Sequence, residues 1–101
     1  MMKNFQSQIE KTKNLESEVE KVLKTKTITG ASGAGLVEIT INGIFEVLNV
    51  SISEDILSPD KKGMVETLIV SAFGDAVKKG WELRKQEVDS TIKGLMGGAK
   101  A

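Results

Sequence analysis

The chain contains no cysteine and no histidine. Without cysteine it has no disulfides, no thiolate zinc sites and no thiol catalysis, which is consistent with a reducing cytoplasm. Without histidine it lacks the commonest general base and metal ligand, so only carboxylates, lysines and hydroxyls remain for chemistry. Aromatic residues are scarce, with three phenylalanines, one tryptophan and no tyrosine. We therefore expect neither an enzyme nor an RNA-recognition sheet with stacking aromatics.

Long hydrophobic runs are also missing. No apolar run approaches the roughly 18 to 20 residues of a membrane span, and the first residues lack the basic-then-apolar order of a signal peptide. We expect a soluble, cytoplasmic protein with no membrane partner. The 101 residues support one domain with a modest core. Because a domain of this size leaves roughly a third of its unfolded surface exposed, oligomerisation is expected.

Positive and negative charges cancel over the whole chain, which by itself argues against an electrostatic nucleic-acid binder. Their distribution is uneven. The balance is +2 over residues 1–26, −5 over residues 27–60 and +3 over residues 61–101. A basic helical framework therefore flanks an acidic sheet region, although ordinary solvated helix faces would give a similar count.

Hydrophobic periodicity divides the chain into helix, three strands and helix. A 3.6-residue period marks the two ends, and β-branched residues alternate between them. We interpret the chain as a single α+β domain, α-β-β-β-α, in which a three-stranded antiparallel sheet is flanked by long helices. The expected elements are a helix at about 4–24, strands at about 26–29, 35–42 and 44–52, a helix at about 59–93, and a flexible tail at 94–101.

The second and third strands meet at Asn42-Gly43, a pair typical of a two-residue type I′ hairpin. This turn predicts that Ile41 faces Ile44 and that Ile39 faces Glu46. One sheet face is then almost wholly apolar and should hold the helices. The opposite, mixed face is our candidate dimer surface, carried by Leu36, Phe45 and Val47.

The second long helix has a clear start, with Ser58 as an N-cap acceptor and Pro59 at the first helical position. A helix from Pro59 to about Ile92 would be about 50 Å long, whereas a compact domain of this size has a radius of gyration of about 13 Å. The helix must therefore break or protrude. Gly74 and Gly80 mark places for close packing or a bend. We expect a helical arm that projects beside the first helix.

The glycine-rich run from Gly30 to Gly35 suggests phosphate binding at first sight. A P-loop, however, needs a Lys-Ser/Thr pair and a following helix, and neither is present. Ser32 is not in a nucleophile elbow, because position 34 is alanine. The neighbouring acids Glu54 and Asp55 have no third ligand, since consecutive side chains diverge. We therefore predict a structural turn, no cofactor, no metal and no small-molecule substrate.

Four short runs resemble the YbaB/EbfC family of bacterial nucleoid-associated proteins. They are Gly30 to Val37, Ile41-Asn42-Gly43, Val50-Ser51-Ile52, and Leu68 to Ala76, and the order of elements matches over nearly the whole chain. The resemblance implies a homodimer joined through the sheet region, with paired helical arms shaped like tweezers, that binds duplex DNA and affects nucleoid organisation or gene expression. Gly74 departs from the family pattern, in which asparagine is common, and the first helix is less rich in methionine and glutamine.

Basic residues on the arms are the candidate DNA contacts, since lysine and arginine neutralise phosphates. The candidates are Lys13, Lys21, Lys78, Lys79, Arg84, Lys85 and Lys93. Local ion pairing is the alternative, because Lys79 has Asp75, Lys78 has Glu82 and Arg84 has Glu87 within a helical turn.

Trp81 can be interpreted as a wedge into DNA or, as apolar positions on a helix stripe more often are, as a packing residue. We expect binding by shape, with weak sequence preference. The competing hypothesis is a dimeric protein–protein interaction module without direct DNA binding.

Overall fold

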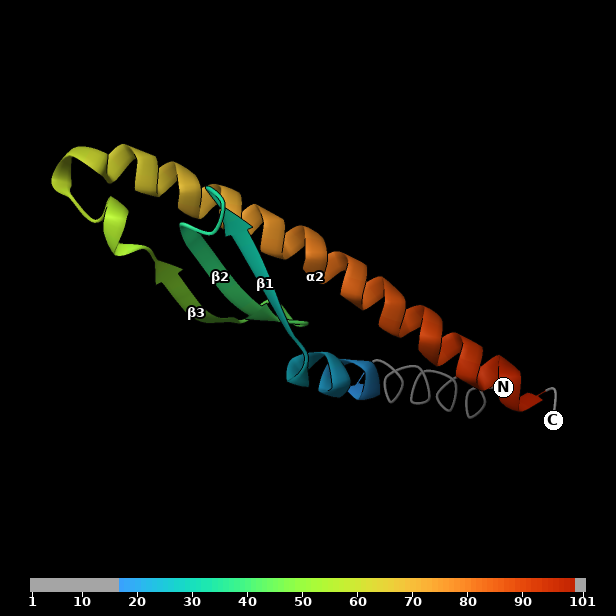
Figure 1. Cartoon of the computed structure of the whole chain (residues 1–101). Helices are drawn as coiled ribbons and strands as arrows, with labels where there is room; N and C mark the ends of the chain where they lie inside the picture. Colours follow the sequence, from blue (N-terminus) through green and yellow to red (C-terminus); the bar gives the residue numbers. More distant parts are fainter. Residues whose placement is uncertain (1–16, 100–101) are drawn as a thin grey trace, which may run out of the picture.

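The protein is a three-stranded antiparallel sheet covered by one long helix, with a second helical segment at its base (Figure 1). The computed structural model describes residues 17–99. Residues 17–25 are helical, and we call them the N-terminal helical segment. The remaining elements are β1 (Thr27–Ser32), β2 (Val37–Asn42), β3 (Val47–Ile52), η1 (Glu54–Ile56), η2 (Pro59–Lys61) and α2 (Lys62–Ala99). The predicted α+β class is confirmed, whereas the predicted helix before residue 17 lies outside the described residues.

The sheet has the order β1-β2-β3, and its central strand carries the core. Val37, Ile39 and Ile41 alternate along β2 and are buried against α2, as one face of a half-buried strand requires. Ala72 and Ala76 are the buried residues of α2 in the same cluster. The opposite face is polar, where the hydroxyls of Thr29 and Thr40 lie 3.1 Å apart on paired strands.

Gly30 sets how closely α2 approaches the sheet. It lies within β1, opposite Ile39, rather than in the turn that the sequence predicted. A Cβ at this position would lie 2.3 Å from the carbonyl oxygen of Ala72 and 2.3 Å from the backbone nitrogen of Ala76. The helix backbone therefore occupies the space that any side chain would need. The expected structural turn follows at residues 33–36, with positive φ at Gly33 and Gly35.

The predicted two-residue hairpin is wrong. Gly43 does not adopt positive φ, which a type I′ turn requires at both central residues. The connection instead runs to Glu46, with positive φ at Phe45 and a bulge beside Ile41. The observed pairs are Val37 with Ile52, Ile39 with Val50 and Ile41 with Val47.

Asn42 explains this wider loop. Its buried side-chain oxygen accepts hydrogen bonds from the backbone N–H groups of Ile44 (3.1 Å) and Glu46 (2.9 Å). Its amide nitrogen donates to the Glu46 carboxylate at 2.7 Å. Gly43 is needed for close packing, because a Cβ at this position would lie 2.6 Å from the carbonyl oxygen of Leu23. The glycine thus permits a contact with the N-terminal helical segment.

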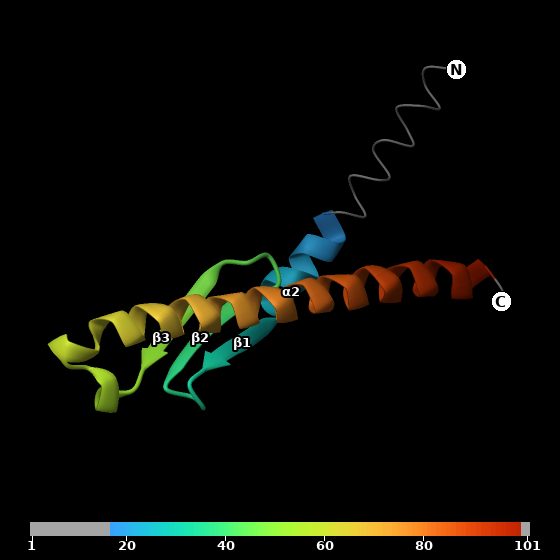
Figure 2. The same ribbon diagram turned by 90° about the horizontal axis from the view of Figure 1, so that it is seen from above.

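The N-terminal helical segment is fixed to the sheet at its C-terminal end. Leu23 is fully buried, and the N–H of Gly43 donates to the carbonyl oxygens of Leu23 (2.8 Å) and Lys26 (3.1 Å). The Lys26 ammonium forms an ion pair with Glu87 on α2. From this anchor the segment leaves the sheet at an angle to α2 (Figure 2).

Helix α2 is uninterrupted and protrudes, which is one of the two outcomes that its length allowed. Neither Gly74 nor Gly80 breaks it, and it continues to Ala99, beyond the predicted end near residue 93. Each helical glycine costs about 1 kcal/mol relative to alanine, which weakens a helix without ending it. The radius of gyration is 19.4 Å, well above the value of about 13 Å for a compact domain. Within residues 17–99, no helix combines the length and apolarity that crossing a bilayer demands.

The start of α2 differs from the predicted cap. Pro59 opens the short turn η2, and α2 follows from Lys62. The Ser58 hydroxyl makes no capping bond, whereas the Ser58 carbonyl oxygen accepts the N–H of Lys61 at 3.0 Å. Proline still occupies the first helical position, where its missing N–H removes no bond.

The two outer strands have different edges. On β1, the N–H of Ala31 donates to Asp75 at 3.0 Å, and the carbonyl oxygen of Thr29 accepts from Lys79 at 3.1 Å. These groups point away from β2, so side chains of α2 close this edge. Among the described residues, no segment other than β2 pairs with β3. The β3 edge is open.

Candidate nucleic-acid interface

The candidate lysines that lie exposed are Lys78, Lys79, Lys85 and Lys93 on α2, with Lys21 on the N-terminal helical segment. Lys13 lies outside the described residues. Lys78 and Lys85 are two turns apart, so they lie on the same side of the helix about 10 Å from each other. Over residues 17–99, none of the salt bridges involves either of them, so the Lys78–Glu82 pairing is absent there. Both ammonium groups are available to a ligand.

Lys79 is already engaged by the fold. Its ammonium lies 3.0 Å from the Asp75 carboxylate and donates to the Thr29 carbonyl oxygen. The local pairing expected for Lys79 is therefore present. The hydrogen bond from the Ala31 N–H, followed by the one from Lys79, lowers the pKa of the Asp75 carboxyl.

Arg84 is half-buried and reaches the sheet as well. Its guanidinium donates to the carbonyl oxygen of Gly43 at 3.3 Å and lies over the rings of Phe45 and Trp81, at 5.7 and 5.9 Å from their centroids. The pairing of Arg84 with Glu87 suggested by their spacing is not formed, because Glu87 binds Lys26 instead. The guanidinium of Arg84 is thus held in place by contacts within its own chain.

Phe45, Trp81 and Arg84 form a cluster that the sequence did not predict. The two ring centroids are 5.1 Å apart with planes tilted by 48°. Gly80 makes room, because a Cβ there would lie 2.7 Å from the Phe45 ring. Trp81 nevertheless stays 61% exposed. The one local signal is the pair Gly80-Trp81, which stands between the basic pairs Lys78-Lys79 and Arg84-Lys85.

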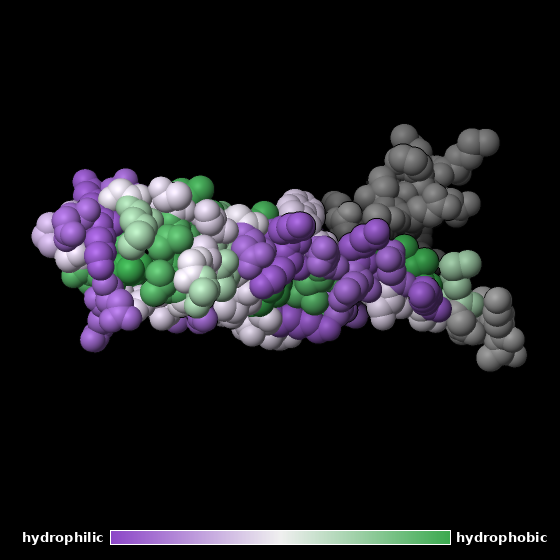
Figure 3. Space-filling view, turned by 45° about the horizontal axis from the view of Figure 1, so that its top comes forward, coloured by the Kyte–Doolittle hydropathy of each residue, from purple (hydrophilic) through white to green (hydrophobic). Residues whose placement is uncertain are grey.

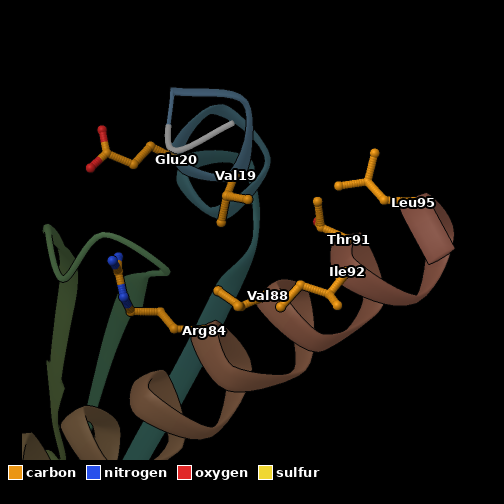
Figure 4. Close-up of a pocket in the computed structure, with 7 residues that line it drawn as sticks. All are labelled: Val19, Glu20, Arg84, Val88, Thr91, Ile92 and Leu95. Carbon is orange, nitrogen blue, oxygen red and sulfur yellow. The ribbon is translucent and has the colours of Figure 1, made fainter. Parts of the chain in front are cut away.

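A groove of about 290 Å³ separates the N-terminal helical segment from the arm (Figure 4). Val19 points across it toward Val88, and Arg84 stands at its end nearest the sheet (Figure 4). Its lining residues are Val19, Glu20, Arg84, Val88, Thr91, Ile92 and Leu95. The apolar stripe predicted to run along the arm therefore faces the first helix.

The candidate dimer residues divide into two kinds. Leu36 and Phe45 are partly buried and pack against the core of their own chain. Val47 is 52% exposed, and Leu48 and Val50 on the same strand are exposed as well. The apolar surface open to a partner therefore runs along β3.

The outer surface of α2 changes character along its length. Figure 3 shows hydrophobic side chains gathered over the first part of the helix and hydrophilic ones along the arm. No group of three or more metal-ligating side chains occurs in the part of the chain that the structure describes. Besides its charged side chains, the arm exposes one aromatic ring, Trp81, and apolar side chains that include Val88 and Ile92.

Comparison with known proteins gives two findings. The family model described as the YbaB/EbfC DNA-binding family matches residues 1–95. The fold is similar to the crystal structure of the uncharacterized protein HP0035 from Helicobacter pylori, with a TM-score of 0.74 and 25% sequence identity. That match covers 87% of this chain and 92% of the other. Both comparisons span the sheet and the helices together.

Proposed function

Because this chain belongs to the YbaB/EbfC DNA-binding family, we propose that it is a nucleoid-associated protein of the bacterial cytoplasm that binds duplex DNA as a homodimer. Basic side chains on its helical arms contact phosphates, and sequence preference is weak and follows DNA shape. Bound to the nucleoid, it affects DNA organisation or gene expression. The observation that carries this proposal is the family match over residues 1–95.

The exposed lysines support phosphate contact. Lys78 and Lys85 share one side of the arm, and each phosphate they neutralise releases a counterion. Lys21 and Lys93 extend this basic set. A single copy has zero net charge, so its attraction to DNA depends on local clusters of basic residues rather than on the charge of the whole chain. Two copies double the cluster, which supports a dimer as the DNA-binding form.

The open edge of β3 supports the homodimer. A strand that leaves its backbone groups unpaired and carries exposed Val47 and Val50 is a ready template for a second copy. Leu36 and Phe45 pack against the core of their own chain instead, so β3 carries the proposed contact. The arms of the two copies then project from a shared sheet region.

A salt titration with a short duplex tests the proposal. We expect affinity to fall steeply as salt rises, and the double variant Lys78→Glu/Lys85→Glu to reduce the slope of log affinity against log salt by about 2. Lys62→Glu, at the sheet end of α2, is the matched control and should leave the slope unchanged. Absence of binding even at low salt would contradict the proposal and favour a protein–protein interaction module.

A further inference from the structure

We propose that Trp81, held by Phe45 and Arg84, is a stacking platform for unpaired bases, so that the arm prefers DNA whose base stack is interrupted. This inference rests on the proposed DNA binding and adds to it a class of preferred DNA. The phosphate-binding lysines alone would give no such preference, because phosphates occur equally in matched and mismatched duplexes.

The platform is built before any ligand arrives. Phe45 adopts a φ of 65°, a left-handed conformation that costs a non-glycine residue free energy. Its ring lies over the backbone of Gly80 and beside the indole of Trp81. Strain of this kind persists where the surrounding structure holds it, and here it places a ring behind an exposed tryptophan.

Arg84 completes the support. Its hydrogen bond to the Gly43 carbonyl oxygen fixes the guanidinium over both rings. The cation therefore polarises the indole and cannot swing away freely. An aromatic face beside a fixed guanidinium suits a planar group that carries negative charge nearby, as a nucleotide does.

Cations surround Trp81, whereas two other exposed apolar residues of α2, Val70 and Phe73, have none beside them. Lys78 precedes it by three residues and Lys85 follows it by four, so both are its neighbours on the helix surface. Val70 and Phe73 are also exposed on this helix. No lysine or arginine stands three or four residues from either of them. The surface around Val70 and Phe73, which lacks cations, suits another copy of the chain, whereas the basic surroundings of Trp81 suit a nucleic acid.

A matched duplex keeps its bases stacked on one another, so their faces are closed to a side chain. A bubble, in which several pairs are mismatched, leaves bases whose faces can stack on an indole. Truncating an aromatic residue that stacks on a base weakens binding by roughly 5- to 150-fold. The platform should therefore add at least about 5-fold to the affinity for a bubble over the matched duplex.

The experiment uses Trp81 as its own probe, since it is the only tryptophan of the chain. The full-length protein is titrated with a matched duplex and with the same duplex carrying a central bubble. We expect the bubble to quench the tryptophan emission more strongly and to bind at least about 5-fold more tightly. Trp81→Ala should remove this preference while the matched duplex still binds. Trp81→Phe should retain part of it, and Leu57→Ala, an exposed apolar control, should retain all of it.

The outcomes separate the platform from the proposed function. Equal affinity of the wild-type protein for both probes, with unquenched tryptophan, overturns the platform and leaves duplex binding intact. Tryptophan emission that shifts with protein concentration and ignores DNA assigns Trp81 to contact between copies and also overturns it. Absence of binding to either probe at low salt overturns the proposed function together with the platform. The quenching measurement needs no variant, so it holds even where Trp81→Ala folds poorly.

Discussion

Asp75 on α2 accepts a hydrogen bond from the backbone N–H of Ala31 on β1, at 3.0 Å. Lys79, one turn further along α2, reaches back to the same strand. Because both partners are backbone groups, of Ala31 and Thr29, these two hydrogen bonds require no particular side chain at those two positions. It fastens the helix to the strand at the edge that would otherwise lie open.

Asp75 should make stability depend on pH in the acidic range. Its pKa is lowered in the folded protein, so the ionised carboxylate stabilises the fold above its ordinary pKa of 3.8 and this contribution is lost as pH falls through the lower, folded value. We expect urea midpoints of the wild-type protein to drop below about pH 4, and those of Asp75→Asn to drop less. Asp89→Asn on the exposed arm serves as the control. Parallel pH profiles for wild type and Asp75→Asn would contradict this expectation.

Lys78 and Lys79 are neighbours in sequence with different expected roles. Lys79→Gln should lower the unfolding temperature, because it frees the Asp75 carboxylate and the Thr29 carbonyl, and should leave the salt slope of DNA binding almost unchanged. Lys78→Gln should leave the unfolding temperature almost unchanged and reduce the salt slope of DNA binding by about 1. Thermal unfolding and salt titration of both variants test the contrast. It fails if the Lys79 variant loses as much slope as the Lys78 variant.

Gly30 and Gly74 should respond oppositely to alanine. At Gly30 the new Cβ would meet backbone atoms of Ala72 and Ala76 at 2.3 Å, so we expect a loss of about 3 kcal/mol or more in the free energy of unfolding. Gly74 has no atom within 4 Å of the added Cβ, and alanine there should stabilise the helix by about 0.5–1 kcal/mol. Denaturant unfolding measures both. A destabilised Gly74→Ala would indicate that a second copy packs at this position.

Asn42→Ala tests the loop that replaces the predicted hairpin. The change leaves two backbone N–H groups, of Ile44 and Glu46, without their acceptor. We expect a loss of about 1–3 kcal/mol in the free energy of unfolding. Asn49→Ala, on the exposed strand β3, should stay within about 0.5 kcal/mol of the wild type. Equal effects of the two alanines would contradict the network around Asn42.

Some features of the fold could be predicted because their causes are local. The 3.6-residue period that includes Val65, Leu68 and Ala72 identifies α2, and these residues pack on the sheet. Pro59 marks where the helical region begins. The length of α2 limited the outcomes to a break or a protrusion, and the helix protrudes.

Other features escaped prediction because they join distant parts of the chain. The pair Asn42-Gly43 predicts a tight turn on local grounds. The N–H of Gly43 instead donates to the carbonyl oxygen of Leu23, which lies on another element. Glu87 was matched to Arg84 by spacing, whereas the fold brings it to Lys26. The contact between Trp81 and Phe45 likewise joins α2 to the loop before β3. No local pattern carries such information.

Val47 tests the proposed dimer surface more cleanly than Phe45 does. Phe45 packs on its own core and on Trp81, so Phe45→Asp, which should dissociate a dimer built on this surface, would also disturb the fold. Val47→Asp places a charge on an exposed position of β3, and we expect a monomer that keeps its unfolding temperature within a few degrees. Sedimentation measures the mass, with Thr27→Asp on β1 as the control. A dimer that persists in Val47→Asp would place the interface elsewhere.

In the proposed assembly through β3, the contrast between the two sheet edges would also limit how many copies can join. A chain with two open edges pairs head to tail without end and gives filaments, whereas a chain with one open edge pairs once, edge to identical edge, and then stops. The side chains of Asp75 and Lys79, which reach from α2 to the edge of β1, would therefore prevent further copies from adding there. Loss of both should convert a particle of defined stoichiometry into a growing polymer.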